Sequence, residues 1–137
     1  YDVDTTALGD PPGFVSTVEK ITFSCDRDAV RGILSAAAGM RKKGRRVIEG
    51  RVATGDRFLT DASEKRAIVY EFGAFSCDQE SCAIAQVCDV YETPCAVIRA
   101  ISDASDGEHA AEFGAFAQRA AKIAADLAWK YLENTYH

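Results

Sequence analysis

The chain has 137 residues, of which 47% are hydrophobic and 27% are charged, and its formal net charge is −5. This length is typical of one globular domain, and the apolar fraction excludes an intrinsically disordered chain. The acidic balance argues against nucleic-acid binding, and no apolar stretch approaches the ~20 residues of a membrane-spanning helix. Because the chain begins at Tyr1 without Met or a signal-like segment, we expect a piece of a longer protein.

The cysteine and histidine content argues against a disulfide framework and against a metal site. The five cysteines are an odd number and include no C-x2-C pair. The only histidines are His109 and His137, so we expect no zinc site. We therefore predict that the five cysteines are small buried thiols. Free thiols indicate a reducing compartment, which here is the cytoplasm.

The first forty residues predict a loop followed by one helix. Residues 1–20 are punctuated by Gly and Pro, which favours a loop, with a short strand near Val18–Phe23. Ser24 or Asp26 then caps a helix that ends near Gly39.

The middle of the chain predicts one strand and one helix. The basic run RKKGRR at 41–46 predicts a solvated loop, with an anion site as the alternative. Residues 47–54 are a strand candidate in which Gly50 marks a bulge, and 55–58 form a turn. Residues 61–72 have the composition of a helix.

The last part of the chain predicts two strands and two helices. Residues 74–77 form a short strand, and 81–91 form a helix that ends before Pro94. The continuous apolar run at 95–101 indicates a strand buried on both faces, and 111–134 indicate the longest helix. The apolar stripe of that helix is Phe113, Phe116, Ala120, Ile123, Leu127 and Tyr131. The alternation of strands and helices predicts an α/β fold.

An acidic residue follows each of three predicted strands: Asp56, Glu80 and Asp103. Ligands of open α/β sheets bind beyond the carboxyl ends of the strands, so these acids are candidate site residues. Each also has a structural explanation, as a turn residue, a first-turn acid of a helix or a loop cap. The sequence holds no phosphate-binding glycine motif and no plausible Ser–His pair, which leaves acid–base chemistry by carboxylates.

Four segments, in order along the chain, resemble the 5′-methylthioadenosine/S-adenosylhomocysteine nucleosidases of the nucleoside phosphorylase superfamily. They are DVDTTALG, GRVATGDRFL, CDQESCAIAQVC and PCAVIRAISDASD, and the resemblance runs from Tyr1 to about Leu132. It implies a three-layer α/β/α fold with a mixed, mostly parallel sheet. Residues 1–137 would be the C-terminal portion of that single domain.

The resemblance implies a purine nucleosidase that hydrolyses the N-glycosidic bond of 5′-methylthioadenosine and S-adenosylhomocysteine and releases adenine. Such cleavage passes through an oxocarbenium-like transition state. Asp103 would be the catalytic acid that protonates adenine, and Ser102 would orient it. Glu80 would accept hydrogen bonds from the ribose hydroxyls and stabilise positive charge on the sugar.

The resemblance also assigns further substrate-binding residues. Phe58 would stack on adenine, and the main chain of Leu59 would meet the edge of the base. Phe113 would cover the 5′-thio tail or else belong to the core stripe of its helix. Gln79 stands where the family has a Met under the sugar, which leaves the preferred substrate open. Arg99 matches a family arginine on a buried strand, where it would need a partner.

The resemblance further implies which partners the chain has. Leu8 stands where the family lends an aromatic side chain to the neighbouring subunit, which implies a homodimer. The water-activating glutamate and the first strands of the family lie upstream of Tyr1. The N-terminal half of the domain, as a separate chain or a missing region, is therefore the expected partner. A purine nucleoside is the expected ligand, and the expected pathway is methionine salvage. We expect no cofactor, no metal and no binding to nucleic acid or membrane.

Two other functions stay open at this point. A purine nucleoside phosphorylase would use phosphate in place of water, and a non-catalytic module would bind adenine nucleosides without cleaving them. Substrates of the deoxyadenosine or futalosine type also stay open.

Overall fold

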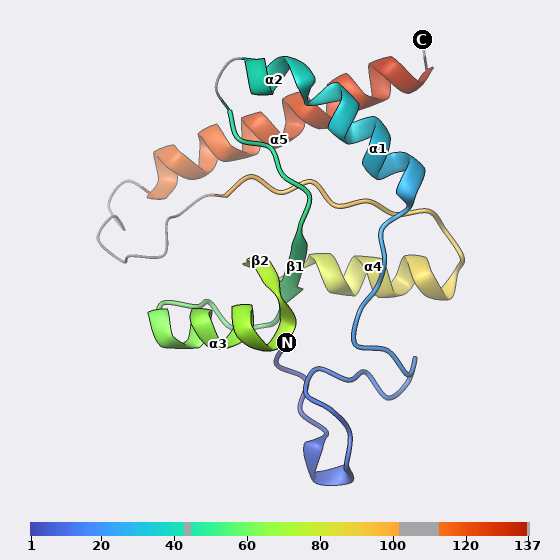
Figure 1. The fold of residues 1–137 in the computed structure, drawn as a ribbon, viewed down its shortest axis with the longest axis vertical. Coiled ribbons are helices and arrows are strands. Elements are labelled where there is room, and N and C mark those ends of the chain that lie inside the picture. The colour runs from blue at the N-terminus through green and yellow to red at the C-terminus, as the bar shows by residue number, and fades with distance from the viewer. Residues whose placement is uncertain (43–44, 102–112, 137) are drawn as a thin grey trace. The chain divides into compact units, whose positions relative to one another are not determined.

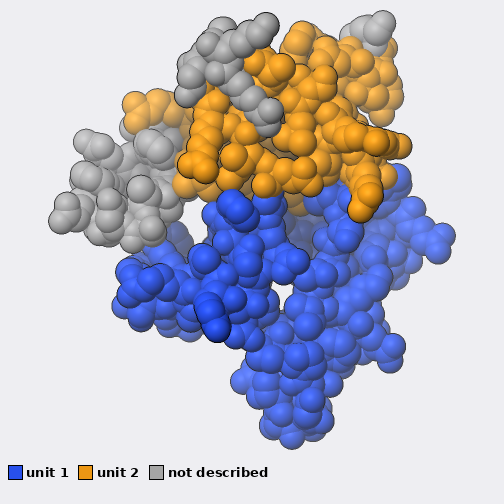
Figure 2. All heavy atoms as spheres, in the orientation of Figure 1, with its two compact units in different colours: residues 1–25, 50–95 blue, residues 26–49, 96–137 orange. Residues whose placement is uncertain are grey.

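The structure, a computed structural model, describes residues 1–42, 45–101 and 113–136, and only the main chain of 41–42 and 113–116. Its elements are η1 (Thr6–Leu8), α1 (Arg27–Ala36), α2 (Ala38–Lys42), β1 (Arg51–Thr54), α3 (Ala62–Phe72), β2 (Ala74–Asp78), α4 (Ser81–Val90) and α5 (Phe113–Tyr136) (Figure 1). Residues 1–25 and 50–95 form one compact unit, and residues 26–49 and 96–137 form the other (Figure 2). No helix within the described ranges is long and apolar enough to cross a membrane.

Unit 1 is built on a parallel pair of strands. Strand β1 runs parallel to β2, and the chain between them forms α3, which makes a β–α–β arrangement (Figure 1). The strands predicted at 47–54 and 74–77 are confirmed, although β1 begins at Arg51 rather than at residue 47. Thr54 pairs with Asp78, so both strands end at the same edge of the sheet.

The strand irregularity lies in β2 and not at Gly50, where the sequence predicted it. Arg51 pairs with Ala74 and Val52 with Ser76, which leaves Phe75 as an extra residue of β2. A Cβ atom on Gly50 would lie 2.8 Å from the ring of Phe75. The absence of a side chain at Gly50 therefore lets the ring of Phe75 lie close to the main chain.

Helix α3 begins and ends at residues suited to those positions. The carboxylate of Asp61 accepts hydrogen bonds from the main-chain N–H groups of Ser63 and Glu64, at 2.7 and 3.0 Å. Gly73 ends the helix with a positive φ of 62°, a conformation that glycine adopts at little cost. The helix covers a small core made of Ala53, Leu59, Ile68 and Ala74, with Tyr1 and Phe72 at its margin.

Unit 2 is a pair of packed helices. Asp26 caps α1 by accepting from the N–H of Ala29 at 2.8 Å, as the sequence predicted. The core consists of Ala36, Ala37 and Leu127, with Ile33, Met40, Val47, Ile98 and Tyr131 packed against it. The predicted stripe on α5 is confirmed at Ala120 and Leu127, which are buried, and the side chains of Phe113 and Phe116 lie outside the described residues.

Two predicted strands are wrong. Near Val18–Phe23 the only pairing is a single bridge between Val15 and Lys20. Residues 95–101 form no strand, since the described sheet holds only β1 and β2. An apolar run becomes a strand only where a neighbour accepts its hydrogen bonds, and none of the described segments pairs with this run. Arg99, expected on a buried strand, is exposed.

Two smaller predictions also need correction. The basic run at 41–46 is not all loop, because α2 extends through Lys42. The cysteines are all free, as predicted, but none is fully buried, and Cys77 is exposed.

Candidate functional site

The carboxyl edge of the β1–β2 sheet brings together two chain segments that the sequence marked as candidates. Loop 55–59 follows β1, and residues 79–80 follow β2 and lead into α4. Two of the three predicted strand-end acids, Asp56 and Glu80, therefore leave the same edge of one sheet. The third, Asp103, lies outside the described residues.

Asp78 is the buried centre of this edge, with only 7% of its surface exposed. Its carboxylate accepts a 2.6 Å hydrogen bond from the hydroxyl of Thr54 and further bonds from the N–H and hydroxyl of Ser81. The hydroxyl of Thr54 in turn accepts from the N–H of Cys82 at 3.0 Å. This network joins the ends of both strands to the first turn of α4, and hydrogen bonds offset the cost of burying the charge.

Glu80 occupies the N-cap position of α4, and its side chain is exposed. The positive end of the helix dipole favours a negative charge there. The Asp78 network fixes the first turn of α4 immediately after Glu80. The exposed side chain of Glu80 therefore lies at a helix end that hydrogen bonds hold in place.

The main chain of loop 55–59 is held from β2 and from the first residues of the chain. The N–H of Gly55 donates to the carbonyl of Asp78 at 3.0 Å. The N–H of Asp56 donates to the carboxylate of Asp2 at 2.6 Å, and its carbonyl accepts from the side-chain amide of Gln79 at 2.9 Å. These hydrogen bonds hold the main chain of the loop at Gly55 and Asp56.

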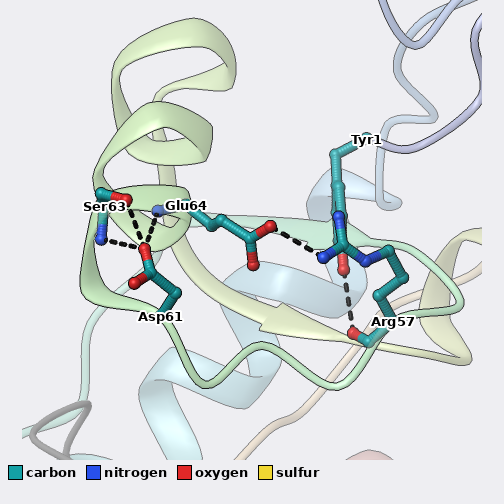
Figure 3. Close-up of polar contacts among 5 residues, drawn as sticks. All are labelled: Tyr1, Arg57, Asp61, Ser63 and Glu64. Atoms are coloured by element: carbon teal, nitrogen blue, oxygen red, sulfur yellow. Dashed lines mark hydrogen bonds and ion pairs between the residues drawn. The ribbon is translucent and has the colours of Figure 1, made fainter.

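Arg57 connects the same loop to α3 and to Tyr1 (Figure 3). Its guanidinium forms a 2.7 Å ion pair with Glu64, which raises the pKa of Arg57 above its ordinary value. The hydroxyl of Tyr1 donates to the carbonyl of Arg57 at 3.0 Å, and burial raises the pKa of this phenol. The phenol therefore remains a donor at neutral pH.

Phe58 and Leu59 are adjacent but differently exposed. Phe58 has 67% of its surface exposed, whereas Leu59 has 9% and belongs to the core of unit 1. The buried side chain of Leu59 anchors the loop and leaves only its main chain for a ligand. The exposed ring of Phe58 is available for stacking.

The remaining predicted site residues are placed as follows. Ser102 and Asp103 lie outside the described residues, and Phe113 is described only as the first residue of α5. Leu8, expected to reach a neighbouring subunit, is 81% exposed at the end of η1.

The cysteines near this edge are not suited to nucleophilic catalysis. Burial is the main cause that raises the pKa values of the Cys77 and Cys82 thiols. A thiol that stays protonated at neutral pH is a poor nucleophile. Among the described residues, no group of three or more His, Cys, Asp and Glu side chains is placed to hold a metal ion.

Sequence reasoning missed Thr54 and Asp78, the two residues that organise this edge. A signal for Asp78 was present, because Asp three residues before Ser81 fits the pattern of a helix N-terminus. Thr54 gave no such signal, since its role depends on which residue faces it on the neighbouring strand.

Comparisons with known proteins agree on the family of this chain. The family model described as the phosphorylase superfamily matches residues 1–133. An aminodeoxyfutalosine nucleosidase of Campylobacter jejuni is 36% identical over 133 residues, which cover 97% of this chain and 56% of that protein. The chain therefore spans about half the length of the curated relatives it matches.

Solved structures show the same fold. A 5′-methylthioadenosine/S-adenosyl homocysteine nucleosidase of Campylobacter jejuni has a TM-score of 0.85 and 34% identity, covering 98% of this chain and 57% of that one. The Neisseria meningitidis nucleosidase, in complex with methylthio-immucillin-A, has a TM-score of 0.86 and 30% identity, covering 97% and 57%. The predicted nucleoside phosphorylase-like α/β fold is thereby confirmed. The chain belongs to the phosphorylase superfamily.

Proposed function

We propose that this chain carries the adenine- and ribose-binding side of a purine nucleosidase. The reaction is hydrolysis of the N-glycosidic bond of 5′-substituted adenine nucleosides, such as 5′-methylthioadenosine and S-adenosylhomocysteine, with release of adenine. The observation that carries the proposal is the family match over residues 1–133, in which the relatives are named as nucleosidases. The carboxyl edge described above supports it, because the segments that follow β1 and β2 carry an exposed aromatic ring and an exposed acid.

In this proposal the residues of unit 1 bind the substrate. Glu80 accepts hydrogen bonds from the ribose hydroxyls and stabilises the positive charge that develops on the sugar. Phe58 stacks on adenine, which its 67% exposed ring supports. Leu59 meets the edge of the base through its main chain, a role that its buried side chain supports.

The acid of the reaction is Asp103, oriented by Ser102. Protonation of adenine makes it a far better leaving group, and the sugar then resembles an oxocarbenium ion. Phe113 covers the apolar 5′ substituent. These three assignments rest on the family resemblance, because the residues lie outside the described side chains.

The proposal requires a partner segment for water activation. The chain spans 56% of the aminodeoxyfutalosine nucleosidase that it matches. The unmatched part of such a relative would supply the glutamate that activates water and the remaining strands. A second copy of the protein would complete a homodimer through Leu8, and the five free thiols fit a reducing compartment, the cytoplasm.

The experiment is reconstitution. This chain is mixed with the segment of the Campylobacter jejuni aminodeoxyfutalosine nucleosidase that it does not match, and adenine release is followed by chromatography. We expect adenine from 5′-methylthioadenosine, and none when Asp103→Asn replaces the acid. The parallel substrates S-adenosylhomocysteine and aminodeoxyfutalosine identify the 5′ substituent that is preferred.

Two outcomes would favour the alternative functions. Adenine release that depends on phosphate and yields ribose 1-phosphate would indicate a phosphorylase. Tight calorimetric binding of 5′-methylthioadenosine without turnover by the assembled protein would indicate a binding module. The proposal would be refuted if no pairing of the chain with the complementary segment showed either binding or turnover.

A further inference from the structure

Gln79 has a different environment from its neighbour Glu80, although both follow β2. Its side-chain amide donates a 2.9 Å hydrogen bond to the main-chain carbonyl of Asp56. That carbonyl belongs to loop 55–59, two residues before Phe58. The amide of Gln79 therefore joins the segment after β2 to the loop after β1 at the edge where both strands end.

The bond completes a set of fixed points along loop 55–59. Gly55 is held through its N–H by Asp78, and Asp56 through its N–H by Asp2. The N–H of Asp56 belongs to the peptide between Gly55 and Asp56, whereas its carbonyl belongs to the next peptide, between Asp56 and Arg57, and this carbonyl accepts from the Gln79 amide. Without that bond the peptide between Asp56 and Arg57 would lose a side-chain hydrogen bond that holds its carbonyl.

The loop position matters because Phe58 has little packing of its own. Its ring is mostly exposed, so its direction is set by the main chain on either side of it. Leu59 anchors the far side through the core, and the Asp56 main chain anchors the near side. A displaced Asp56 carbonyl would turn the peptide that leads into Phe58.

We infer that Gln79 is a positioning residue for recognition of the purine base and acts through loop 55–59. This inference rests on the proposed function, in which Phe58 and Leu59 meet adenine. It assigns to Gln79 an effect on the base and none on the sugar, although Gln79 adjoins the sugar-binding Glu80. A residue that contacted the sugar directly would show the opposite selectivity.

The first measurement follows the loop in the chain itself. Hydrogen–deuterium exchange is compared between the wild type, Gln79→Met and Gln79→Glu, because neither variant offers a neutral amide donor to the Asp56 carbonyl. We expect about 3–10-fold faster exchange in peptides that cover 55–59, as loss of one hydrogen bond implies. Gln118→Met, the same change at an exposed position of α5, is the matched control and should leave this exchange unchanged.

The second measurement separates base from sugar in the reconstituted protein. We expect Gln79→Met to weaken adenine binding about 3–10-fold by calorimetry, with the affinity for 5-methylthioribose unchanged. Unchanged exchange in loop 55–59, or equal weakening for both ligands, would overturn the inference. A wild-type assembly that binds neither ligand would instead refute the proposed function, and the inference with it.

Discussion

At the scale of single residues, the Thr54 hydroxyl has two roles that no isosteric apolar group replaces. It donates to the buried Asp78 carboxylate and accepts from the N–H of Cys82. We expect Thr54→Val to lower the free energy of unfolding by about 1–3 kcal/mol, because it removes one hydrogen bond to the buried Asp78 carboxylate and the acceptor of the Cys82 N–H. Urea unfolding followed by circular dichroism measures this. Thr60→Val, the same change at an exposed position, should lie within about 0.5 kcal/mol of the wild type.

A second residue-scale prediction concerns Asp61 and pH. The side-chain hydrogen bond from Ser63, and then the main-chain bonds, hold the pKa of Asp61 below its ordinary value of 3.8. A lowered pKa in the folded state stabilises the fold at pH above 3.8, and this stabilisation is lost as the pH falls through the folded-state value. We therefore expect Asp61→Ala to lower the Tm at pH 7 and the difference to shrink below pH 3.8.

The control for this pH profile lies on the same helix. Glu71→Ala removes a carboxylate from the last turn of α3, at the opposite end of the helix from the Asp61 cap. Its Tm difference from the wild type should stay small at neutral pH. A Tm difference for Asp61→Ala that is constant down to pH 2 would contradict the assigned cap.

At the scale of elements, the packing of α1 against α5 can be tested by comparing the same substitution at two glycines. Alanine in a helix interior normally stabilises relative to glycine, by about 1 kcal/mol. A Cβ on Gly32 would lie 2.6 Å from the ring of Tyr131, whereas a Cβ on Gly39 would meet nothing within 4 Å. We expect Gly32→Ala to destabilise by about 1 kcal/mol or more, and Gly39→Ala to stabilise, in thermal unfolding. In a Tyr131→Leu background, Gly32→Ala should lose its penalty.

The helices could be predicted from the sequence because their signals are local. Asp26 marks the start of α1, Pro94 limits α4, and the stripe through Leu127 identifies α5. The run at 95–101 predicts a strand because its apolar character is equally local. Strand formation depends on a partner elsewhere in the chain, which no local pattern contains. The same limit explains why Glu80 was found as a candidate and the Thr54–Asp78 pair was not.

At the scale of the whole molecule, α4 shows an apolar face with no cover among the described residues. Ile84, Val87 and Tyr91 recur at helical spacing, and all three are more than half exposed. Single exposed apolar residues are common, but a row on one helix face indicates an interaction site. The match covers 56% of the first relative, so we propose that a segment corresponding to the unmatched part covers this face.

This face yields a prediction about assembly. We expect the chain alone to enhance the fluorescence of the apolar dye ANS and the enhancement to fall when the complementary segment of the relative is added. Val87→Lys should reduce both the dye signal and assembly, which gel filtration measures. Gln118→Lys adds the same charge on α5 and should leave assembly intact. Assembly that is unaffected by Val87→Lys would contradict this assignment of the face.

The two compact units are not consecutive stretches of the chain. Unit 1 takes residues 1–25 and 50–95, and unit 2 takes 26–49 and 96–137, so the polypeptide passes between them three times. No single break in the gene would therefore release either unit as a continuous polypeptide. An engineer who wanted unit 1 alone would have to delete residues 26–49, join Cys25 to Gly50 by a new linker and end the chain at Cys95. A single crossover within residues 26–95 would exchange parts of both units together.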